Sequence, residues 1–207
     1  MSSIILQSSP EWATARLGKV TASRVSDVVA RTKSGYGASR GNYMAELICE
    51  RLTGKWAESY TNAAMQWGVE NEPQARRIYE FEEDVAVLPA AFVPHPRIPM
   101  AGATPDGFVD DSGLLEIKCP LTKEHIETLL DKQPQKKYIY QMQWQMASTG
   151  REWTDFVSFD PRMPGEMQLF KLRIFRDGQV IDELEQEVQV FLVELEAKLE
   201  QLRARHG

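Results

Sequence analysis

Three side chains that could together cleave a phosphodiester bond lie in the segment ATPDGFVDDSGLLEIKCP, residues 103–120. They are the carboxylates of Asp106 and Glu116 and the ammonium group of Lys118. Carboxylate oxygens are suitable ligands for Mg²⁺, and a neighbouring lysine can polarise water or steady the charge of a pentavalent phosphate. A half-buried cluster of charges is costly unless it is paired or binds a metal, so function is the simplest reason to keep it.

The local strand pattern brings these three side chains together. Residues 107–109 and 114–118 read as two strands that flank the turn signal Asp-Asp-Ser-Gly. Because side chains alternate along a strand, Glu116 and Lys118 lie on the same face. A hairpin then places Asp106 beside them.

Each half of the pattern also has an ordinary explanation. Pro-Asp-Gly is a common turn signal, and Glu-x-Lys on a strand can be a solvated ion pair. Together, ten residues apart and with an apolar residue between the acid and the lysine, they match the PD-(D/E)xK pattern of restriction-endonuclease-like nucleases. Short patterns of this kind recur by chance, so the rest of the chain must show whether this one belongs to a nuclease.

The composition is typical of a folded protein, because 43% of the 207 residues are hydrophobic and 26% are charged. It predicts a single domain, 1–207, and excludes global disorder. The formal net charge of −6 argues against indiscriminate binding to polyanions. No stretch is apolar enough to span a bilayer, and the N-terminal residues lack the pattern of a secretory signal, which predicts a cytoplasmic protein without membrane contact.

Other kinds of site find little support in the sequence. Cys49 and Cys119 are too few for a four-cysteine zinc site or an iron–sulfur cluster, and we expect reduced thiols. No G-x-S-x-G motif or complete P-loop occurs, so ATP is not expected. His95, His125 and His206 lack metal-ligand spacing, and we expect His125 to be a partly exposed structural residue.

The hydrophobic pattern predicts helices and strands in alternating groups. Helices are expected over residues 21–30, 42–52, 65–82, 122–130 and 135–146. Besides the hairpin, strands are expected over residues 85–93, 98–101, 153–159 and 167–175. Pro73 should kink or break the third helix, and the Ser/Gly-rich stretch 32–41 should form a mobile loop.

The C-terminal segment carries an apolar stripe at spacings of three and four residues, which predicts an amphipathic helix of about 25 residues. The stripe consists of Ile181, Leu184, Val188, Phe191, Leu195, Leu199 and Leu202. Packing in the core explains such a stripe better than a coiled coil does.

Four blocks of the chain, in order, are similar to those of one nuclease family. They are Ala15-Arg16-Leu17-Gly18 with Thr21-Ala22-Ser23, Trp67-Gly68-x-x-x-Glu72-x-x-Ala75-Arg76, residues 103–120, and Tyr138-x-x-Gln141-x-Gln143. Through them the chain resembles the phage lambda exonuclease and YqaJ-type viral recombinase family over nearly its whole length. The resemblance implies an α/β restriction-endonuclease-like fold, with a mixed central sheet flanked by helices and a long C-terminal helix.

The resemblance implies roles for the residues around the motif. Asp106 and Glu116 would hold Mg²⁺, together with the Ile117 carbonyl, and Lys118 would orient or activate the attacking water. One or two ions could bind there. Mn²⁺ should substitute for Mg²⁺, because both are hard ions that prefer oxygen ligands.

Two helices would add further polar groups to this centre. Glu72 matches an acid that the helix before the sheet contributes, although a surface acid is its ordinary explanation. Gln141 matches a helix glutamine that lines the active site of the family. Gln143 and Gln145 could equally face solvent.

A pocket for a 5′-terminal phosphate is also implied by the resemblance. Arg16, Ser23 and Thr104 fall at its positions and would supply a guanidinium and two hydroxyl groups. The family exonuclease has serine where this chain has Thr104, so the hydroxyl is kept. Met65 falls where the family places an apolar wedge that splits terminal base pairs, although a methionine at a helix start is usually a core residue.

The resemblance implies a ring-shaped homotrimer whose DNA runs through a central channel. Because only the lining of that channel would contact DNA, a chain with net negative charge needs basic residues there alone. The residues that could supply it are Arg31, Lys33, Arg40, Lys132, Lys136 and Lys137. Each could instead be a solvated surface charge.

The activity that the resemblance implies is Mg²⁺-dependent degradation of linear double-stranded DNA from 5′-phosphorylated ends, in the 5′-to-3′ direction. The 3′ single-stranded tails would serve a phage single-strand annealing protein in homologous recombination, within a bacterial host cell. Two alternatives stay open: an endonuclease of the same fold, and a non-catalytic DNA-binding subunit. The complete set of acids and the lysine favours an enzyme.

Overall fold

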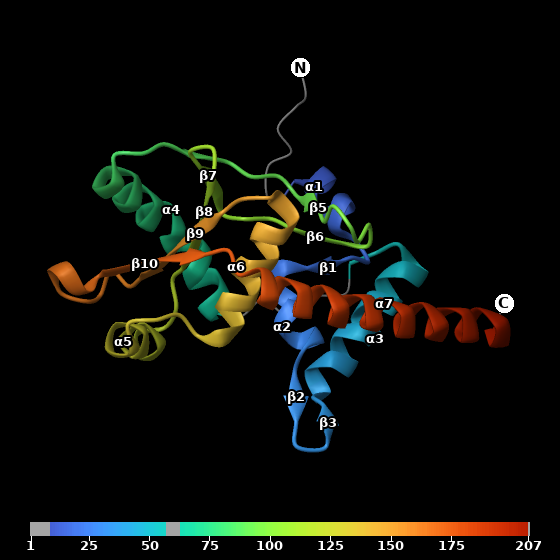
Figure 1. The fold of residues 1–207 in the computed structure, drawn as a ribbon. Helices are drawn as coiled ribbons and strands as arrows, with labels where there is room; N and C mark the ends of the chain where they lie inside the picture. Colours follow the sequence, from blue (N-terminus) through green and yellow to red (C-terminus); the bar gives the residue numbers. More distant parts are fainter. Residues whose placement is uncertain (1–8, 57–62, 207) are drawn as a thin grey trace.

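A five-stranded mixed sheet is the largest sheet of the computed structural model, which describes residues 9–56 and 63–206 (Figure 1). Its strand order is β10-β9-β8-β7-β4. These strands are β4 (Val87–Leu88), β7 (Gly107–Val109), β8 (Gly113–Lys118), β9 (Trp153–Phe159) and β10 (Leu169–Phe175). β8 and β9 run parallel, and the other neighbours are antiparallel. The expected mixed sheet and the hairpin of β7 and β8 are thus confirmed.

Strand β8 is buried on both faces, because a helix packs on each. Leu115 and Ile117 belong to the core cluster beneath α4 (Ala63–Glu83), whereas Leu114 packs with α6 (Lys136–Thr149). Strands covered in this way carry apolar residues at successive positions. A polar side chain at an even-numbered position of β8 therefore faces α6 rather than open water.

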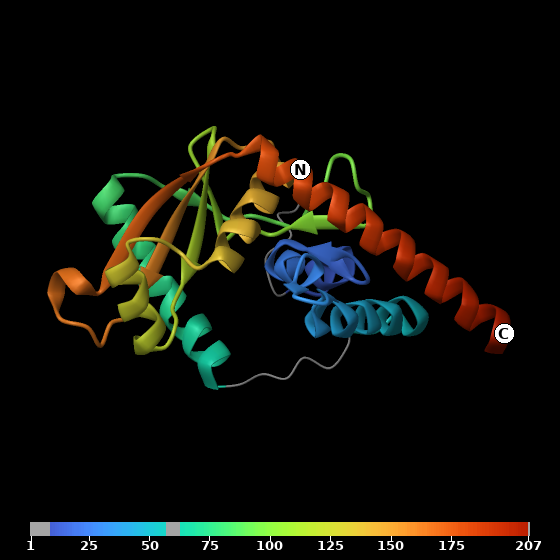
Figure 2. The same cartoon turned by 60° about the horizontal axis from the view of Figure 1, so that its bottom comes forward.

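Helix α6 connects the central sheet with a second sheet of order β1-β6-β5 and lies at the middle of the molecule (Figures 1 and 2). The second sheet and its neighbours are β1 (Val20–Thr21), η1 (Ala22–Arg24), α2 (Val25–Val28), β5 (Val93–Pro94) and β6 (Ala101–Ala103). The helix expected over 21–30 is thus a strand, a 3₁₀ turn and a short helix in succession. Residues 141–148 of α6 are all buried, so polar side chains there must find partners inside the protein.

Residues 32–41 do not form the expected loop. Most of them belong to a projecting hairpin of β2 (Arg31–Thr32) and β3 (Gly35–Tyr36) and to the start of α3 (Ala38–Thr53) (Figure 1). Glu187 accepts hydrogen bonds from Arg31 Nη2 (2.5 Å) and from the Tyr36 hydroxyl (2.8 Å). Local composition could not reveal these bonds, because Glu187 lies far along the chain.

Pro73 does not break α4, which continues unbroken from Ala63 to Glu83. A proline inside a helix removes the hydrogen bond to the carbonyl four residues earlier, here that of Val69. Both Pro73 and Val69 are exposed, so water can solvate this carbonyl.

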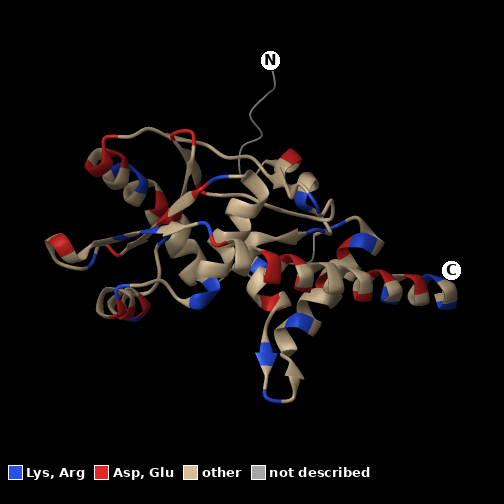
Figure 3. Ribbon diagram, viewed as in Figure 1, with Lys and Arg blue, Asp and Glu red and all other residues tan. Residues whose placement is uncertain are grey.

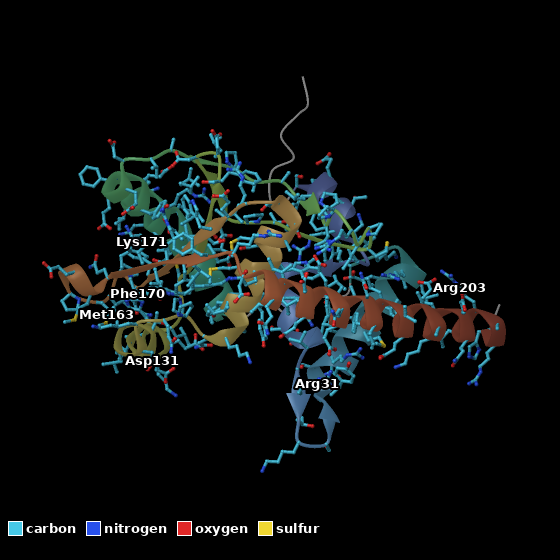
Figure 4. All side chains as sticks on the ribbon, in the orientation of Figure 1. Arg31, Asp131, Met163, Phe170, Lys171 and Arg203 are labelled. Atoms are coloured by element: carbon cyan, nitrogen blue, oxygen red, sulfur yellow. The ribbon has the colours of Figure 1, made fainter. Side chains whose placement is uncertain are left out.

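The C-terminal segment forms α7 (Gly178–His206), and six of the seven stripe residues are buried in the core. Leu202 is the exception, at 39% exposure, because the last turns of α7 extend beyond the body of the protein (Figure 2). Figure 3 shows charges of both signs along this helix, and Figure 4 shows Arg203 near its end. None of the described helices is long and apolar enough to cross a membrane.

His125 is fully buried in α5 (Thr122–Asp131), so the expectation of partial exposure is wrong. Its Nε2 lies 2.8 Å from the carbonyl oxygen of Met167, and its Nδ1 lies 2.7 Å from the Ser158 hydroxyl. Because a carbonyl can only accept, Nε2 carries the proton and Nδ1 accepts from the hydroxyl. His125 is thus a structural residue that ties α5 to β9 and to η2 (Gly165–Met167).

Asp160 anchors the turn between β9 and β10. Its fully buried carboxylate accepts hydrogen bonds from Thr122 Oγ1 (2.7 Å) and Arg162 Nε (2.8 Å). Burial alone would raise the pKa of Asp160, but the hydrogen bonds from Arg162 and Thr122 lower it to about 2.

We therefore expect Asp160→Ala to lower the free energy of unfolding by about 1–3 kcal/mol at pH 7, because Thr122 and Arg162 lose a charged acceptor that is itself buried. Urea unfolding of both proteins measures this difference. A lowered pKa contributes stability above the unfolded pKa of about 3.9, so the difference should shrink as the pH falls from there toward 2. Glu166→Ala, at an exposed position of the same turn, should change little. An unchanged unfolding midpoint for Asp160→Ala would contradict the anchoring role.

Candidate active site

The two acids and the lysine of the motif meet at the end of β8. Glu116 and Lys118 lie on the same face, as alternation predicts, and Lys118 Nζ is 2.6 Å from Glu116 Oε1. Asp106 directly precedes β7, and its Oδ2 accepts a hydrogen bond from the Ile117 backbone N–H (2.6 Å). The hairpin thus fixes Asp106 against the strand that carries the other two groups.

The electrostatics of this cluster favour a cation. Burial raises the pKa of Asp106 well above its usual range, and repulsion from Glu116 and Glu72 raises it further. For Lys118, burial alone would lower the pKa, but the carboxylates of Glu116 and Asp106 raise it, so the ammonium form persists. A positive ion beside the acids would relieve the repulsion that Asp106 experiences.

The oxygen atoms present fit a hard divalent ion such as Mg²⁺. In an antiparallel pair, the N–H and C=O of one residue point to the same neighbouring strand. The Ile117 N–H points to Asp106, so the Ile117 carbonyl lies on the same edge of β8 as Asp106. The pairing of β7 with β8 ends at Gly107 and Leu115, before it reaches Ile117. Within residues 9–56 and 63–206, no group of three His, Cys, Asp or Glu side chains could hold a metal. The groups that could hold a metal here are the carboxylates of Asp106 and Glu116 and the Ile117 carbonyl.

Glu72 lies on α4 and lines a cleft of about 540 Å³ together with Asp106, Ile117 and Lys118. Arg76 Nη2 lies 3.5 Å from Glu72 Oε1 and donates a hydrogen bond to the backbone carbonyl of Asp106. Gly107 makes this approach possible, because a Cβ there would lie 3.1 Å from Arg76 Nη1 and 2.1 Å from a methyl carbon of Val87.

Helix α6 supplies two amide groups to the carboxylate of Glu116. Gln141 Nε2 donates to Glu116 Oε1 and Gln145 Nε2 donates to Oε2, both over 2.6 Å. Gln143 points elsewhere and bonds to the carbonyl of Phe175 and the N–H of Asp177. All three glutamines are buried, so the alternative that Gln143 and Gln145 face solvent is wrong.

The three residues expected to bind a terminal phosphate do lie together. Arg16, Ser23 and Thr104 line a cavity of about 170 Å³, which also reaches the acids, Lys118 and Gln141. One small polar cavity therefore joins the expected phosphate pocket to the expected catalytic centre.

Two tryptophans hold the guanidinium of Arg16. Its Cζ lies 4.2 Å from the ring centroid of Trp12 and 5.0 Å from that of Trp56. Burial lowers the pKa of Arg16, and its buried Nε has no hydrogen-bond partner in the described part of the chain. Trp12 Nε1 donates to Thr104 Oγ1 (3.0 Å), which leaves the Thr104 proton available for another acceptor. A partly buried guanidinium next to the available hydroxyl proton of Thr104 suits an anion.

Residues 11–152 match the model of the YqaJ-like viral recombinase domain. The chain belongs to this family. Among curated proteins, none matches the chain significantly. The matched residues include every block of the sequence that carries the acids, the lysine and the expected phosphate pocket.

This YqaJ-like chain is also similar to solved structures of exonucleases. Two structures of LHK-Exo, an alkaline exonuclease from Laribacter hongkongensis, match 95% of this chain and 97% of theirs. The complex with dAMP has 54% identity and a TM-score of 0.90, and the other structure has 55% and 0.88. A phage-related exonuclease from Haemophilus somnus 129PT shares the fold, at 17% identity and a TM-score of 0.73 over 89% of this chain and 96% of that one. The family and LHK-Exo together support a nuclease function.

Sequence reasoning missed Trp12 and Trp56 at the YqaJ-like site, and it left the position of Gln145 open. Trp12 and Gln145 lie four residues from Arg16 and Gln141, a helical spacing that brings side chains together and could have indicated both. Trp56 has no comparable signal, because it reaches Arg16 from a distant loop.

Of the two residues expected to contact DNA, Met65 lines the cleft of this YqaJ-like site and Arg40 does not. Met65 is 51% exposed and lines the cleft of Glu72 and also the neighbouring cavity with Trp12. Arg40 lines neither cavity of the site: it is 4% exposed, forms an ion pair with Glu194 at 2.5 Å, and packs against Tyr36. The expectation that Arg40 contacts DNA is therefore corrected, because its guanidinium is buried between α3 and α7.

The other basic residues are dispersed. Arg31 is paired with Glu187 on the projecting hairpin (Figure 4), whereas Lys137 lines the same cleft as Glu72. Lys33, Lys132 and Lys136 do not line that cleft.

Proposed function

We propose that the protein is a Mg²⁺-dependent 5′-to-3′ exonuclease, which degrades linear double-stranded DNA from 5′-phosphorylated ends. The observation that carries this proposal is the single cavity that joins Arg16, Ser23 and Thr104 to the acids and Lys118. A site that holds a terminal phosphate next to a hydrolytic centre would select chain ends. The similarity to LHK-Exo, whose structure includes dAMP, supports the release of mononucleotides.

Asp106, Glu116 and the Ile117 carbonyl would hold the divalent ion, which would supply charge neutralisation at the scissile phosphate. Mn²⁺ would serve in the same place. Glu72 adds negative charge to the same cleft.

Lys118 is the group that we assign to the attacking water and the developing phosphate charge. It keeps its proton in the resting site, where it pairs with Glu116, and it can present an N–H to an oxygen in the cavity. Gln141 lines the same cavity and holds Glu116 in place. These side chains would orient the reacting groups and stabilise charge as it develops.

Removal of the Arg16 guanidinium should abolish the preference for a phosphorylated end. We expect Arg16→Ala to lower kcat/KM on a 5′-phosphorylated duplex by about 10- to 100-fold, because a hydrogen bond to a charged group is lost. The 5′-hydroxyl duplex is the internal control, and its slower hydrolysis should change much less. Equal losses on both duplexes would argue against a terminal-phosphate pocket.

The direction of digestion tests the proposal as a whole. Phosphorothioate linkages that resist hydrolysis should block digestion when placed at both 5′ ends of a duplex and leave it unaffected when placed at both 3′ ends. The expected product from the second duplex carries 3′ single-stranded tails. Blockage by the 3′ linkages alone would overturn the 5′-to-3′ assignment.

The proposal also includes an oligomeric state, a protein partner and a cellular compartment. A homotrimeric ring around DNA would elute in light scattering at about three times the 23.6 kDa of one chain. The 3′ tails would be the substrate of a phage single-strand annealing protein in recombination within the cytoplasm of a bacterial host. Pull-down of a purified annealing protein, in the absence of DNA, would test this contact.

A further inference from the structure

Gln145 is a fully buried amide whose one hydrogen bond to the described residues is made to the carboxylate of Glu116. The exposed fraction of its side chain is 0%, and Nε2 lies 2.6 Å from Glu116 Oε2. Its own carbonyl, Oε1, is buried and accepts no hydrogen bond in the described part of the chain. An apolar residue would avoid the cost of this unpaired acceptor, so the amide group must serve Glu116.

The orientation of this amide follows from its surroundings. Turning it over would place its carbonyl oxygen against an oxygen of Glu116, and two acceptors at 2.6 Å repel each other. The N–H group therefore faces the carboxylate, and the unpaired oxygen faces away.

The bonds around Glu116 show what Gln145 does. Oε1 accepts from Gln141 and also from Lys118, whereas Oε2 accepts from Gln145 alone among the described residues. A carboxylate has about four acceptor positions, so roughly one remains open, on Oε2. Gln141 and Gln145 are one helical turn apart and hold the two oxygens from one rigid helix. Glu116 therefore has a fixed orientation before any cation arrives.

We propose that Gln145 is a positioning residue, which orients Glu116 Oε2 for the divalent ion. The proposal rests on the proposed function, because it assumes that Glu116 is a metal ligand. Carboxylate ligands are commonly held by hydrogen bonds from a second layer of residues, and loss of such a partner weakens metal binding or activity by about 10- to 100-fold. Gln145 does not line the cavity itself, so it acts through Glu116.

The test compares Gln145→Met with Gln143→Met. Both replacements remove a buried amide from α6 and are close in size, but Gln143 bonds to Phe175 and Asp177 instead of Glu116. Direct binding of Mn²⁺, followed by electron paramagnetic resonance or calorimetry without DNA, is the first readout. The second is the Mg²⁺ concentration that gives half-maximal hydrolysis, separated from kcat at saturating Mg²⁺.

We expect Gln145→Met to weaken Mn²⁺ binding and to raise the half-maximal Mg²⁺ concentration by about tenfold or more, with kcat largely recovered at high Mg²⁺. Gln143→Met should leave both values unchanged, whatever it does to thermal stability. Gln145→Asn, which is one methylene too short to reach Glu116, is the second variant if Gln145→Met does not fold, and it should show the same loss.

Wild-type Mn²⁺ affinity in Gln145→Met or Gln145→Asn would overturn the positioning role, while the proposed nuclease would stand. A similar loss of affinity in Gln143→Met would also overturn it, because any disturbance of α6 would then suffice. Absence of Mn²⁺ binding by the wild-type protein would instead refute the metal-dependent function on which the inference rests.

Discussion

Lys118→Ala is expected to lower the rate of DNA hydrolysis by about a thousand-fold or more, a typical cost of losing a group that transfers protons or stabilises charge in the transition state. Lys118 is the ammonium group that the structure places in the cavity beside both acids. DNA binding should persist, because Arg16 and its neighbours do not depend on Lys118. Single-turnover hydrolysis at saturating Mg²⁺, together with DNA binding in Ca²⁺, separates the two properties.

Lys123→Ala is a suitable control, because the Lys123 side chain is 86% exposed on α5 and pairs with Glu127 only loosely, at 3.8 Å. It should retain the wild-type rate. If Lys118→Ala kept near-normal turnover, the role assigned to Lys118 would be wrong.

Asp106→Asn is expected to abolish Mg²⁺-dependent hydrolysis and, at the same time, to stabilise the metal-free protein. The carboxylate carries a charge that burial and the repulsion of Glu116 and Glu72 disfavour, as its raised pKa shows. An asparagine oxygen can still accept from the Ile117 N–H, so the hairpin should keep its bond. Each 1 kcal/mol of relief would raise Tm by about 2–4 °C for a chain of this length.

The stability difference between Asp106→Asn and the wild type should depend on pH, and the raised pKa of Asp106 sets its direction. Because the pKa of Asp106 is higher in the folded protein, the folded state favours the protonated form, and that stability is lost as the pH rises through the raised pKa. The advantage of Asp106→Asn in EDTA should therefore grow with pH above the unfolded value of about 3.9. Thermal unfolding at pH 5 and pH 8 measures it.

Added Mg²⁺ should reverse this order of stabilities. An ion that binds the folded state alone raises Tm of the wild type, whereas Asp106→Asn should show no such rise. A variant that was less stable than the wild type in EDTA at pH 8, or that still gained stability from Mg²⁺, would contradict the charge distribution that we describe.

Local patterns allowed the centre of the fold to be predicted. A turn signal between two short apolar runs indicated the hairpin of β7 and β8, and alternation placed Glu116 and Lys118 on one face. The amphipathic period also predicted the buried face of α7, except in its last turns, which extend beyond the body of the protein. In each case the information lies within a few neighbouring residues.

Contacts between distant segments could not be predicted in this way. Arg40 seemed available for DNA, but Glu194, 154 residues later, pairs with it, and Phe191 packs beside it. Trp56 reaches Arg16 from a loop that has no pattern of its own. The burial of Gln145 depends on α6 lying between two sheets, which no local period reveals.

The most direct test of the account is the release of nucleotides from three duplexes in Mg²⁺: linear with 5′-phosphate, linear with 5′-hydroxyl, and covalently closed circular. We predict rapid release from the phosphorylated linear duplex, slower release from the hydroxyl duplex and none from the circle. Nicking of the circle would assign an endonuclease instead, and the absence of hydrolysis on all three duplexes would contradict the catalytic role of Asp106, Glu116 and Lys118.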